Sequence, residues 1–152
     1  MKVIKVKVIT DDDVIQKYSI VNPSQIEFFI IAYLNDPDGW SKKGYFFEPV
    51  RENENVTIHL SSPETIKKKC GMSGLSCAEL GGTRMWLNSE RWFHGASKSK
   101  LSLDNYRQYM VSHEIGHILG HDHQSCPCVG CKAPIMMQQT KGIGKCKPNT
   151  SV

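Results

Sequence analysis

Residues 113–123 read His-Glu-Ile-Gly-His-Ile-Leu-Gly-His-Asp-His and contain four of the six histidines in a chain of 152 residues. His113 and His117 are four positions apart, which places both imidazoles on the same side of a helix. Gly120 can end that helix in a left-handed conformation, where a side chain would clash. The reversed chain can then return His123 to the first two histidines. The stretch therefore predicts a helix that ends beside a cluster of three imidazoles.

The residue types in this cluster favour a catalytic zinc site. Three neutral nitrogens, from His113, His117 and His123, leave a fourth zinc position open for water. Glu114 follows the first ligand and can reach that water without binding the metal. His121 is an alternative ligand, but the spacing after the helix-ending glycine favours His123. We therefore expect one catalytic Zn²⁺, with Glu114 as the catalytic residue.

Two long helices are predicted around this cluster. The first opens at Asn22-Pro23, because Asn22 can cap it and proline is tolerated at the first helical position. Its apolar stripe ends before the turn signal at 35–39. The second begins after Ser102, a plausible N-cap, with Asp104 in the first turn. This second helix continues into the histidine motif.

The remaining elements are predicted from alternation, apolar runs and turn residues. Strands are expected at residues 2–9, 45–47, 56–60 and 83–87. Asp11-Asp12-Asp13 is expected to be a turn, after which Val14 to Val21 pairs back as a second strand. Ser62-Pro63 starts a short helix, and Ser89 to Lys100 is expected to be a loop. His59 is a lone strand histidine, for which a structural or exposed role is expected.

Composition and charge exclude several classes of protein. With 39% hydrophobic and 22% charged residues, the chain is an ordinary globular domain rather than a collagen, a coiled coil or a disordered chain. Its longest apolar runs, such as Phe28 to Ala32, fall far short of the roughly 20 residues of a transmembrane helix. The net charge of +4 comes mostly from scattered lysines. We therefore expect no membrane span, no nucleic-acid partner and a monomer.

Six cysteines are many for this length, and their even number suits disulfides in an oxidising compartment. Cys70 to Cys77 encloses two glycines and is expected to form a small closed loop. Residues 1–10 alternate like a strand and lack the apolar run of a signal peptide. The cysteines favour an extracellular or cell-surface location, whereas the lack of a signal-peptide pattern in residues 1–10 argues against export. No propeptide is expected either, since residues 1–100 are needed to build the domain.

The histidine motif and the stretch Ala133-Pro134-Ile135-Met136-Met137 together resemble the metzincin clan of zinc metallopeptidases. In that clan a tight turn places a methionine beneath the metal. We assign Met136 to this Met-turn position, with Met137 as the alternative. A closer resemblance, to an actinobacterial zincin-like domain family of unassigned function, covers most of the C-terminal two thirds of the chain. Its matching segments there are Trp86–Trp92, Tyr106–Gly120, Ala133–Thr140 and Cys146–Asn149, and Asn35–Pro37 also matches.

The resemblance implies an α+β, zincin-like (metzincin) fold. In this fold a mixed twisted β-sheet packs on a backing helix and an active-site helix, and the cleft follows the edge strand of the sheet. Residues 1–152 are then a single domain. Its upper N-terminal subdomain covers about 1–120, and a small lower C-terminal subdomain covers about 121–152.

By analogy with the clan, the resemblance implies a zinc-dependent metalloendopeptidase acting on a peptide or protein substrate in extended conformation. Glu114 would serve as general base and then as general acid. Some metzincins have an oxyanion-binding tyrosine where this chain has Gln138, which leaves that task to zinc alone. The alternatives are a zinc amidase acting on cell-wall or other non-protein amides, and a zinc-binding pseudoenzyme or interaction module. The intact Glu114 argues against the last.

The resemblance also bears on the cysteines. It implies the disulfides Cys70–Cys77 and Cys126–Cys146, and the two additional cysteines can form a third, Cys128–Cys131. A different interpretation is a second, structural zinc bound by four thiolates, because archaemetzincins carry a cysteine-bound zinc at a different spacing. Its ligands would be Cys126, Cys128, Cys131 and Cys146. Both interpretations stay open at the level of sequence.

Overall fold

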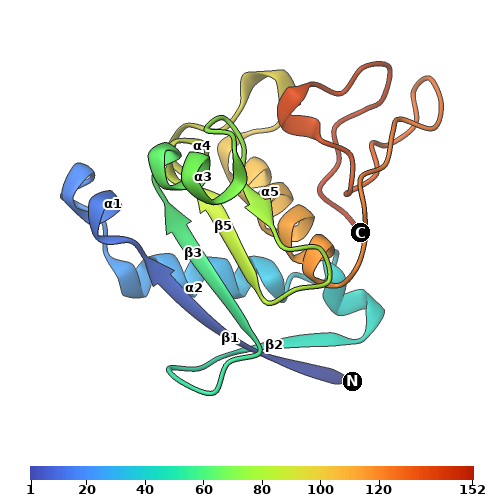
Figure 1. The fold of residues 1–152 in the computed structure, drawn as a ribbon. Helices are drawn as coiled ribbons and strands as arrows, with labels where there is room; N and C mark the ends of the chain where they lie inside the picture. Colours follow the sequence, from blue (N-terminus) through green and yellow to red (C-terminus); the bar gives the residue numbers. More distant parts are fainter.

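A computed structural model describes all 152 residues, and its centre is a five-stranded sheet with strand order β2-β1-β3-β5-β4 (Figure 1). Four strands run parallel, and β4 is an antiparallel strand at one edge. The strands confirm the four predicted from the sequence and add the short β4. Their bounds are β1 (Lys2–Thr10), β2 (Tyr45–Pro49), β3 (Val56–Ser61), β4 (Cys77–Ala78) and β5 (Arg84–Asn88).

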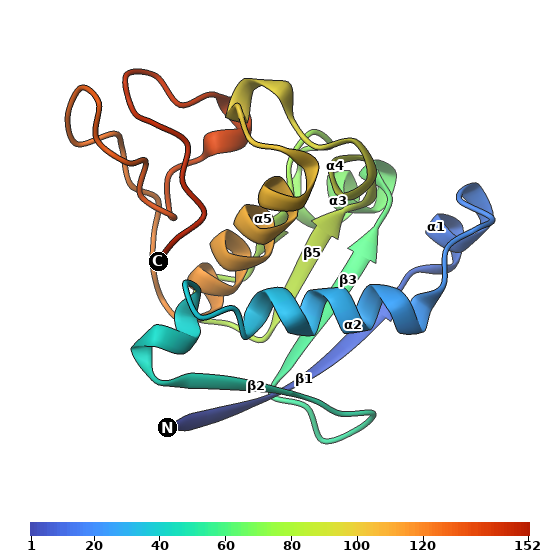
Figure 2. The same cartoon turned by 180° about the vertical axis from the view of Figure 1, so that it is seen from behind.

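Two long helices, α2 (Pro23–Leu34) and α5 (Leu103–Ile118), pack on one face of the sheet and against each other (Figure 2). Helix α2 lies over β1 and β2, while α5 lies along β5 and β4. The packing buries one side of α2 in the core, including Ile30, and leaves Phe28 exposed. This arrangement confirms the two long helices that the sequence predicts and their packing on the sheet. No helix has both the length and the apolar character to cross a membrane.

The predicted helix starts are confirmed by their capping bonds. The Asn22 side chain accepts hydrogen bonds from the backbone N–H groups of the first turn of α2, and Ser102 does the same for α5. Ser62 caps the short helix α3 (Pro63–Cys70). Each cap satisfies a backbone donor that has no partner within the helix.

The expected strand at residues 14–21 is wrong: a short helix, α1 (Asp12–Lys17), follows β1 directly. Asp12 and Asp13 lie in its first turn, where negative charge is favourable beside the positive end of the helix dipole. Strand β1 is already paired on both sides, with β2 and β3, so it offers no edge to a returning strand.

The loop expected at residues 89–100 is also wrong in part. It contains a helix, α4 (Ser89–His94), and a 3-10 turn, η2 (Ser97–Ser99). The Asn88 side chain caps α4 by accepting a hydrogen bond from the N–H of Glu90, and Trp92 anchors the helix in the core. Two further 3-10 turns are η1 (Trp40–Lys43) and η3 (Gln139–Lys141).

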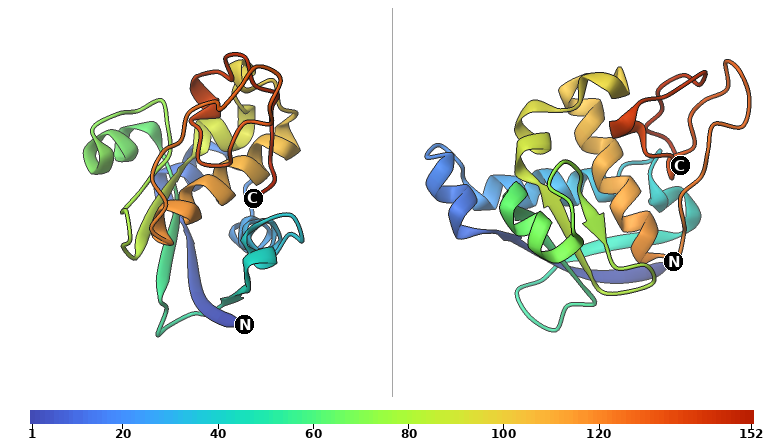
Figure 3. Two further views of the ribbon diagram at one scale, coloured as in Figure 1. Left: turned by 90° about the vertical axis from the view of Figure 1, so that its right-hand side faces the viewer. Right: turned by 45° about the horizontal axis from the view of Figure 1, so that its top comes forward.

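Residues after α5 form a mostly irregular segment that closes one end of the molecule (Figure 3). The Val152 N–H donates to the carbonyl of Asp38, which ties the chain end to the turn after α2. All six cysteines are paired and none is free, so the four-thiolate zinc interpretation is not supported. The disulfides are Cys70–Cys77, Cys126–Cys146 and Cys128–Cys131.

Candidate metal centre and cleft

The last turns of α5 and the segment after it bring His113, His117 and His123 together. One ring nitrogen from each lies within 4.8 Å of the others. Gly120 has a φ of 98° and lets the chain reverse, so that the His121 N–H donates to the carbonyl of Gly116. The structure thus brings together the three histidines that the sequence predicts as ligands.

Backbone carbonyls orient two of these rings. Nδ1 of His113 lies 2.8 Å from the carbonyl of Ile135, and Nδ1 of His117 lies 2.8 Å from the carbonyl of His121. A carbonyl can only accept, so each Nδ1 carries the proton and each Nε2 presents a lone pair. Carbonyl partners of this kind are typical of metal-binding histidines.

The distance between Nε2 of His117 and Nε2 of His123 is 3.1 Å. Two lone pairs facing each other at this distance repel unless a proton or a cation lies between them. Three neutral imidazoles are a donor set that zinc accepts, and the arrangement leaves room for another ligand. The residues present therefore fit a zinc ion.

Burial lowers the pKa of His113 to about 4 and also lowers the pKa of His123. A lowered pKa keeps an imidazole neutral at neutral pH, which is the form that binds metal. The protein therefore presents metal-competent rings without first having to deprotonate them.

Glu114 is buried beside the cluster, and its Oε2 has no hydrogen-bond partner. Burial raises the pKa of this carboxyl group to about 8. An unpartnered buried carboxyl group costs stability, so its place on the wall of a cleft is a mark of a functional site. A pKa close to the working pH suits a group that takes up and releases a proton.

Met136 packs against helix α5 at Gly116. A Cβ added at Gly116 would lie 2.5 Å from the Met136 Sδ and 3.0 Å from Cζ2 of Trp40, so only glycine allows this approach. Met136 is almost fully buried, whereas Met137 is half-buried and its carbonyl accepts from the Tyr109 hydroxyl. The geometry favours Met136 over Met137 as the residue beneath the site.

The other two histidines considered in the sequence lie elsewhere. The His121 ring stacks on Trp40 with 4.6 Å between centroids, and only its backbone carbonyl serves the cluster. Nδ1 of His59, in strand β3, is hydrogen-bonded to Oδ1 of Asp11 at 2.9 Å. A structural role for His59 is therefore supported.

The cluster opens into a cleft of about 200 Å³. One side consists of α5 residues and the three histidines, with Gln138 and Thr140 beside them. The opposite side is mostly apolar and comes from a segment that the sequence analysis did not assign to the site. Its residues are Met72, Leu75, Ser76, Cys77, Ala78 and Leu80.

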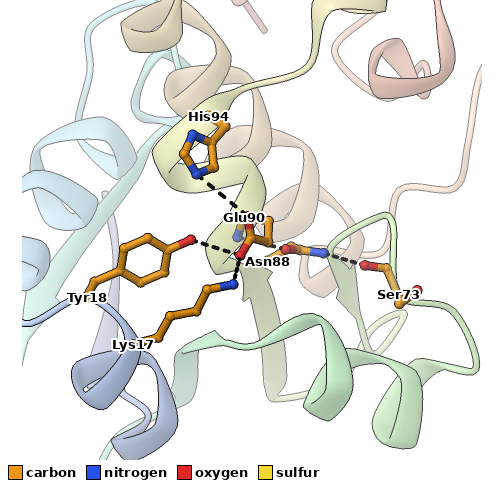
Figure 4. A network of polar contacts seen from close by, with 6 residues as sticks. All are labelled: Lys17, Tyr18, Ser73, Asn88, Glu90 and His94. Carbon is orange, nitrogen blue, oxygen red and sulfur yellow. Dashed lines mark hydrogen bonds and ion pairs between the residues drawn. The ribbon is translucent and has the colours of Figure 1, made fainter.

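This wall is held by Asn88, at the end of β5, and by Arg91 in α4; Figure 4 shows Asn88 with Ser73. The Asn88 amide donates to the carbonyl of Ser73 at 2.8 Å and to that of Leu75 at 3.4 Å. Arg91 Nε donates to the carbonyl of Gly74 at 2.9 Å. Because these bonds join positions 13 to 17 residues apart, no local sequence signal predicts them.

The same end of the sheet is tied to α1 through Glu90. Its carboxylate accepts from the Tyr18 hydroxyl at 2.9 Å and pairs with the Lys17 ammonium group (Figure 4). His94 lies 3.6 Å from the other carboxylate oxygen. These contacts lower the pKa of Glu90, Lys17 first among them, and keep it charged. Helix α4 is thus held to α1 through Glu90 and to the cleft wall through Arg91.

Three solved structures resemble this fold. An archaemetzincin from Methanopyrus kandleri is 14% identical, with a TM-score of 0.54 over 96% of this chain and 88% of its own. An archaemetzincin from Archaeoglobus fulgidus complexed with malonate is 18% identical, with a TM-score of 0.49 over 97% and 95%. Myroilysin is 17% identical, with a TM-score of 0.48 over 80% of this chain, which spans about half (49%) of the myroilysin chain.

The likeness to the Methanopyrus kandleri structure, with the mixed sheet and its two packed helices, shows the predicted α+β zincin-like fold. A search of curated proteins finds no match. Residues 17–149 match the family described as "Protein of unknown function (DUF3152)". Since this match covers most of the 152 residues, the chain belongs to the DUF3152 family.

Proposed function

We propose that this protein is a zinc-dependent metallopeptidase, with His113, His117 and His123 as the zinc ligands and Glu114 as the general base and acid. One observation carries the proposal. A buried carboxyl group without a hydrogen-bond partner lies in a cleft beside three converging imidazole nitrogens. A purely structural zinc site has no use for such a carboxyl group.

Zinc, when bound, supplies Lewis acidity to a substrate carbonyl and makes water a better nucleophile at neutral pH. Glu114 Oε2 accepts the proton of the attacking water, because this oxygen has no competing partner in the protein. Glu114 then delivers the proton to the leaving nitrogen. The carbonyls of Ile135 and His121 keep two imidazoles in the orientation that the ligand set needs.

The substrate is proposed to bind as an extended peptide along β4. This strand pairs with β5 on one side only, and both of its residues, Cys77 and Ala78, line the cleft. A peptide backbone can therefore pair with the free edge of β4 and extend the sheet by one strand. The apolar wall from residues 72–80 is then placed to contact its side chains.

The experiment compares wild-type protein with Glu114→Gln, both loaded with zinc, on a library of unstructured peptides. Glu114→Gln should lose hydrolysis by at least about 100-fold, because general acid–base catalysis contributes this much or more. It should keep its zinc, because Glu114 is not a ligand. Glu52→Gln, a change in an exposed loop, is the matched control and should stay active.

Retained hydrolysis in Glu114→Gln would overturn the proposed role of this residue. Activity of the wild type on cell-wall fragments or other amides, but on no peptide, would support the amidase alternative. Zinc binding with no activity on either class of substrate would support a binding module.

A further inference from the structure

A second cavity, of about 300 Å³, adjoins the cleft. Leu75 and Thr140 line both cavities, so the second one opens beside the proposed substrate path. The turns η2 and η3 lie side by side at this point, as Figures 1 and 2 both show. They come from segments about forty residues apart and bring Lys98 and Lys141 to the same cavity.

The lining of this cavity is strongly basic. Arg91, Lys98 and Lys141 all line it, and no carboxylate does. Neither lysine side chain forms an ion pair or a hydrogen bond within the protein. Three cations without a counter-charge create a positive potential that favours an anion from outside.

Arg91 is a fixed member of this group. Its Nε donates to the carbonyl of Gly74 at 2.9 Å, and Nη1 lies 3.4 Å from the carbonyl of Gly95. These bonds hold the guanidinium plane at the cavity and leave Nη2 without a partner. A guanidinium held in this way needs little reordering to bind a carboxylate.

We propose that this cavity, the basic pocket, is a subsite that binds a carboxylate group of the peptide substrate. The proposal rests on the proposed function, because it takes the neighbouring cleft as the place of the scissile bond. The carboxylate can come from an Asp or Glu side chain or from the C-terminus of the peptide. Both sources present the same planar anion to Arg91 and the two lysines.

The test uses peptides that share one apolar core. In one arm the C-terminus is amidated and a Glu is moved along the peptide one position at a time. In another arm the peptide has no acidic side chain but keeps its C-terminal carboxylate. The reference peptide is neutral and amidated. Affinity is measured with zinc-loaded Glu114→Gln protein, and kcat/KM is measured with the wild type.

We expect one carboxylate-bearing arm to bind and react about tenfold better than the neutral peptide, as hydrogen bonds to a charged group provide. The double variant Lys98→Glu/Lys141→Glu should abolish this preference while leaving activity on the neutral peptide in place. The matched control is Lys145→Glu/Lys147→Glu, which changes charge equally at exposed positions outside the pocket. The control should keep the preference.

Equal binding and cleavage of neutral and acidic peptides by the wild type would overturn the subsite while leaving the metallopeptidase proposal intact. Loss of the preference in the control variant as well would also overturn it, because net charge rather than the pocket would then be responsible. Preferential binding of acidic peptides that are never cleaved would support the subsite and count against the proposed function.

Discussion

At Gly116, helix α5 approaches the side chain of Met136 closely. The position of this glycine in the last turn of α5 costs helix stability, since alanine is preferred over glycine within a helix by up to about 1 kcal/mol. The contact with the Met136 Sδ explains why glycine is nevertheless present. A methyl group at this position has to displace the sulfur atom and also crowds the Trp40 ring.

We predict that Gly116→Ala lowers the free energy of unfolding by about 1–3 kcal/mol, the usual cost of overpacking, in spite of the gain in helix propensity. It should also weaken zinc binding, because the displaced methionine disturbs the turn that carries the Ile135 carbonyl. Chemical denaturation and a zinc competition titration measure the two effects. Met136→Ala should partly relieve the strain in a double-mutant cycle. A more stable Gly116→Ala protein with normal zinc affinity would refute this explanation.

Glu114 should make the metal-free protein less stable at high pH. Its folded-state pKa, raised by burial to about 8, exceeds the ordinary value of 4.5, so the folded protein favours the neutral form. The contribution of Glu114 to the free energy of unfolding is therefore present in full at low pH and is lost as the pH rises toward 8. Glu114→Gln stays neutral and should be more stable than the wild type at pH 8 by a few kcal/mol, to order of magnitude.

Denaturation of the chelator-treated proteins at pH 5.5 and pH 8 measures this difference. The lowered pKa values of His113 and His123 act in the opposite direction, since their contribution is lost as the pH falls, but both proteins share it. An identical pH dependence of the two proteins would mean that Glu114 is not buried as the structure shows.

At the scale of the elements, Asn88 joins the end of β5, the start of α4 and the apolar wall of the cleft. We predict that Asn88→Ala costs about 1–3 kcal/mol, as the loss of a helix cap and of buried hydrogen bonds does. The released wall should raise KM more than it lowers kcat, because the proposed catalytic groups stay in place.

Asn22→Ala is the matched control, since it also removes an N-cap but lies at the start of α2. It should lower stability by about 0.5–2 kcal/mol, the cost of an N-cap, and leave KM unchanged. Denaturation and peptide kinetics on both variants test the comparison. A similar rise in KM in both proteins would show that general destabilisation, and not the wall, is responsible.

The sequence predicted those elements whose capping residues and hydrophobic pattern lie within the element itself or directly beside it. The caps at Asn22, Ser62 and Ser102 and the alternation in β1 are of this kind. Helix α1 was missed because the strand interpretation needed to know that both edges of β1 are occupied. Helix α4 was missed because Asn88, between the predicted strand at 83–87 and the predicted loop at 89–100, was not recognised as a helix cap.

The candidate site shows the same division. The spacing of His113, His117 and His123 follows from helix geometry, so the sequence was sufficient to predict their cluster. The carbonyl of Ile135, the wall at residues 72–80 and the basic pocket depend on contacts between distant segments. No local pattern encodes such contacts, and they became visible only in three dimensions.

For the whole molecule, we propose that residues 121–152 act as a lower subdomain whose position depends on disulfides and on its contacts with residues 1–120. Cys126–Cys146 closes a loop of twenty residues that contains Met136 and lies next to His123 in the chain. Cys70–Cys77 closes a loop of only seven residues at the cleft wall. The two disulfides therefore stabilise different parts of the same site.

We predict that Cys126→Ser/Cys146→Ser lowers the free energy of unfolding by about 3 kcal/mol, because the unfolded chain regains loop-closure entropy. The change should also weaken zinc binding, because His123 lies next to this loop in the chain. Cys70→Ser/Cys77→Ser should cost about 2 kcal/mol, because its loop is shorter, and should leave zinc affinity unchanged. Thermal unfolding and zinc titration of both variants test this. Equal zinc affinity in the two variants would contradict the proposed role of the lower subdomain.

The most direct test of the central claim is the metal content of the purified protein, measured by elemental analysis together with a count of free thiols. The account predicts one zinc per chain, no free thiol, and loss of the zinc in His113→Ala and His117→Ala. His121→Ala serves as the matched control and should keep its zinc. A wild-type protein without zinc that takes none up on addition, or one that keeps its zinc in the His113 and His117 variants, would contradict the account.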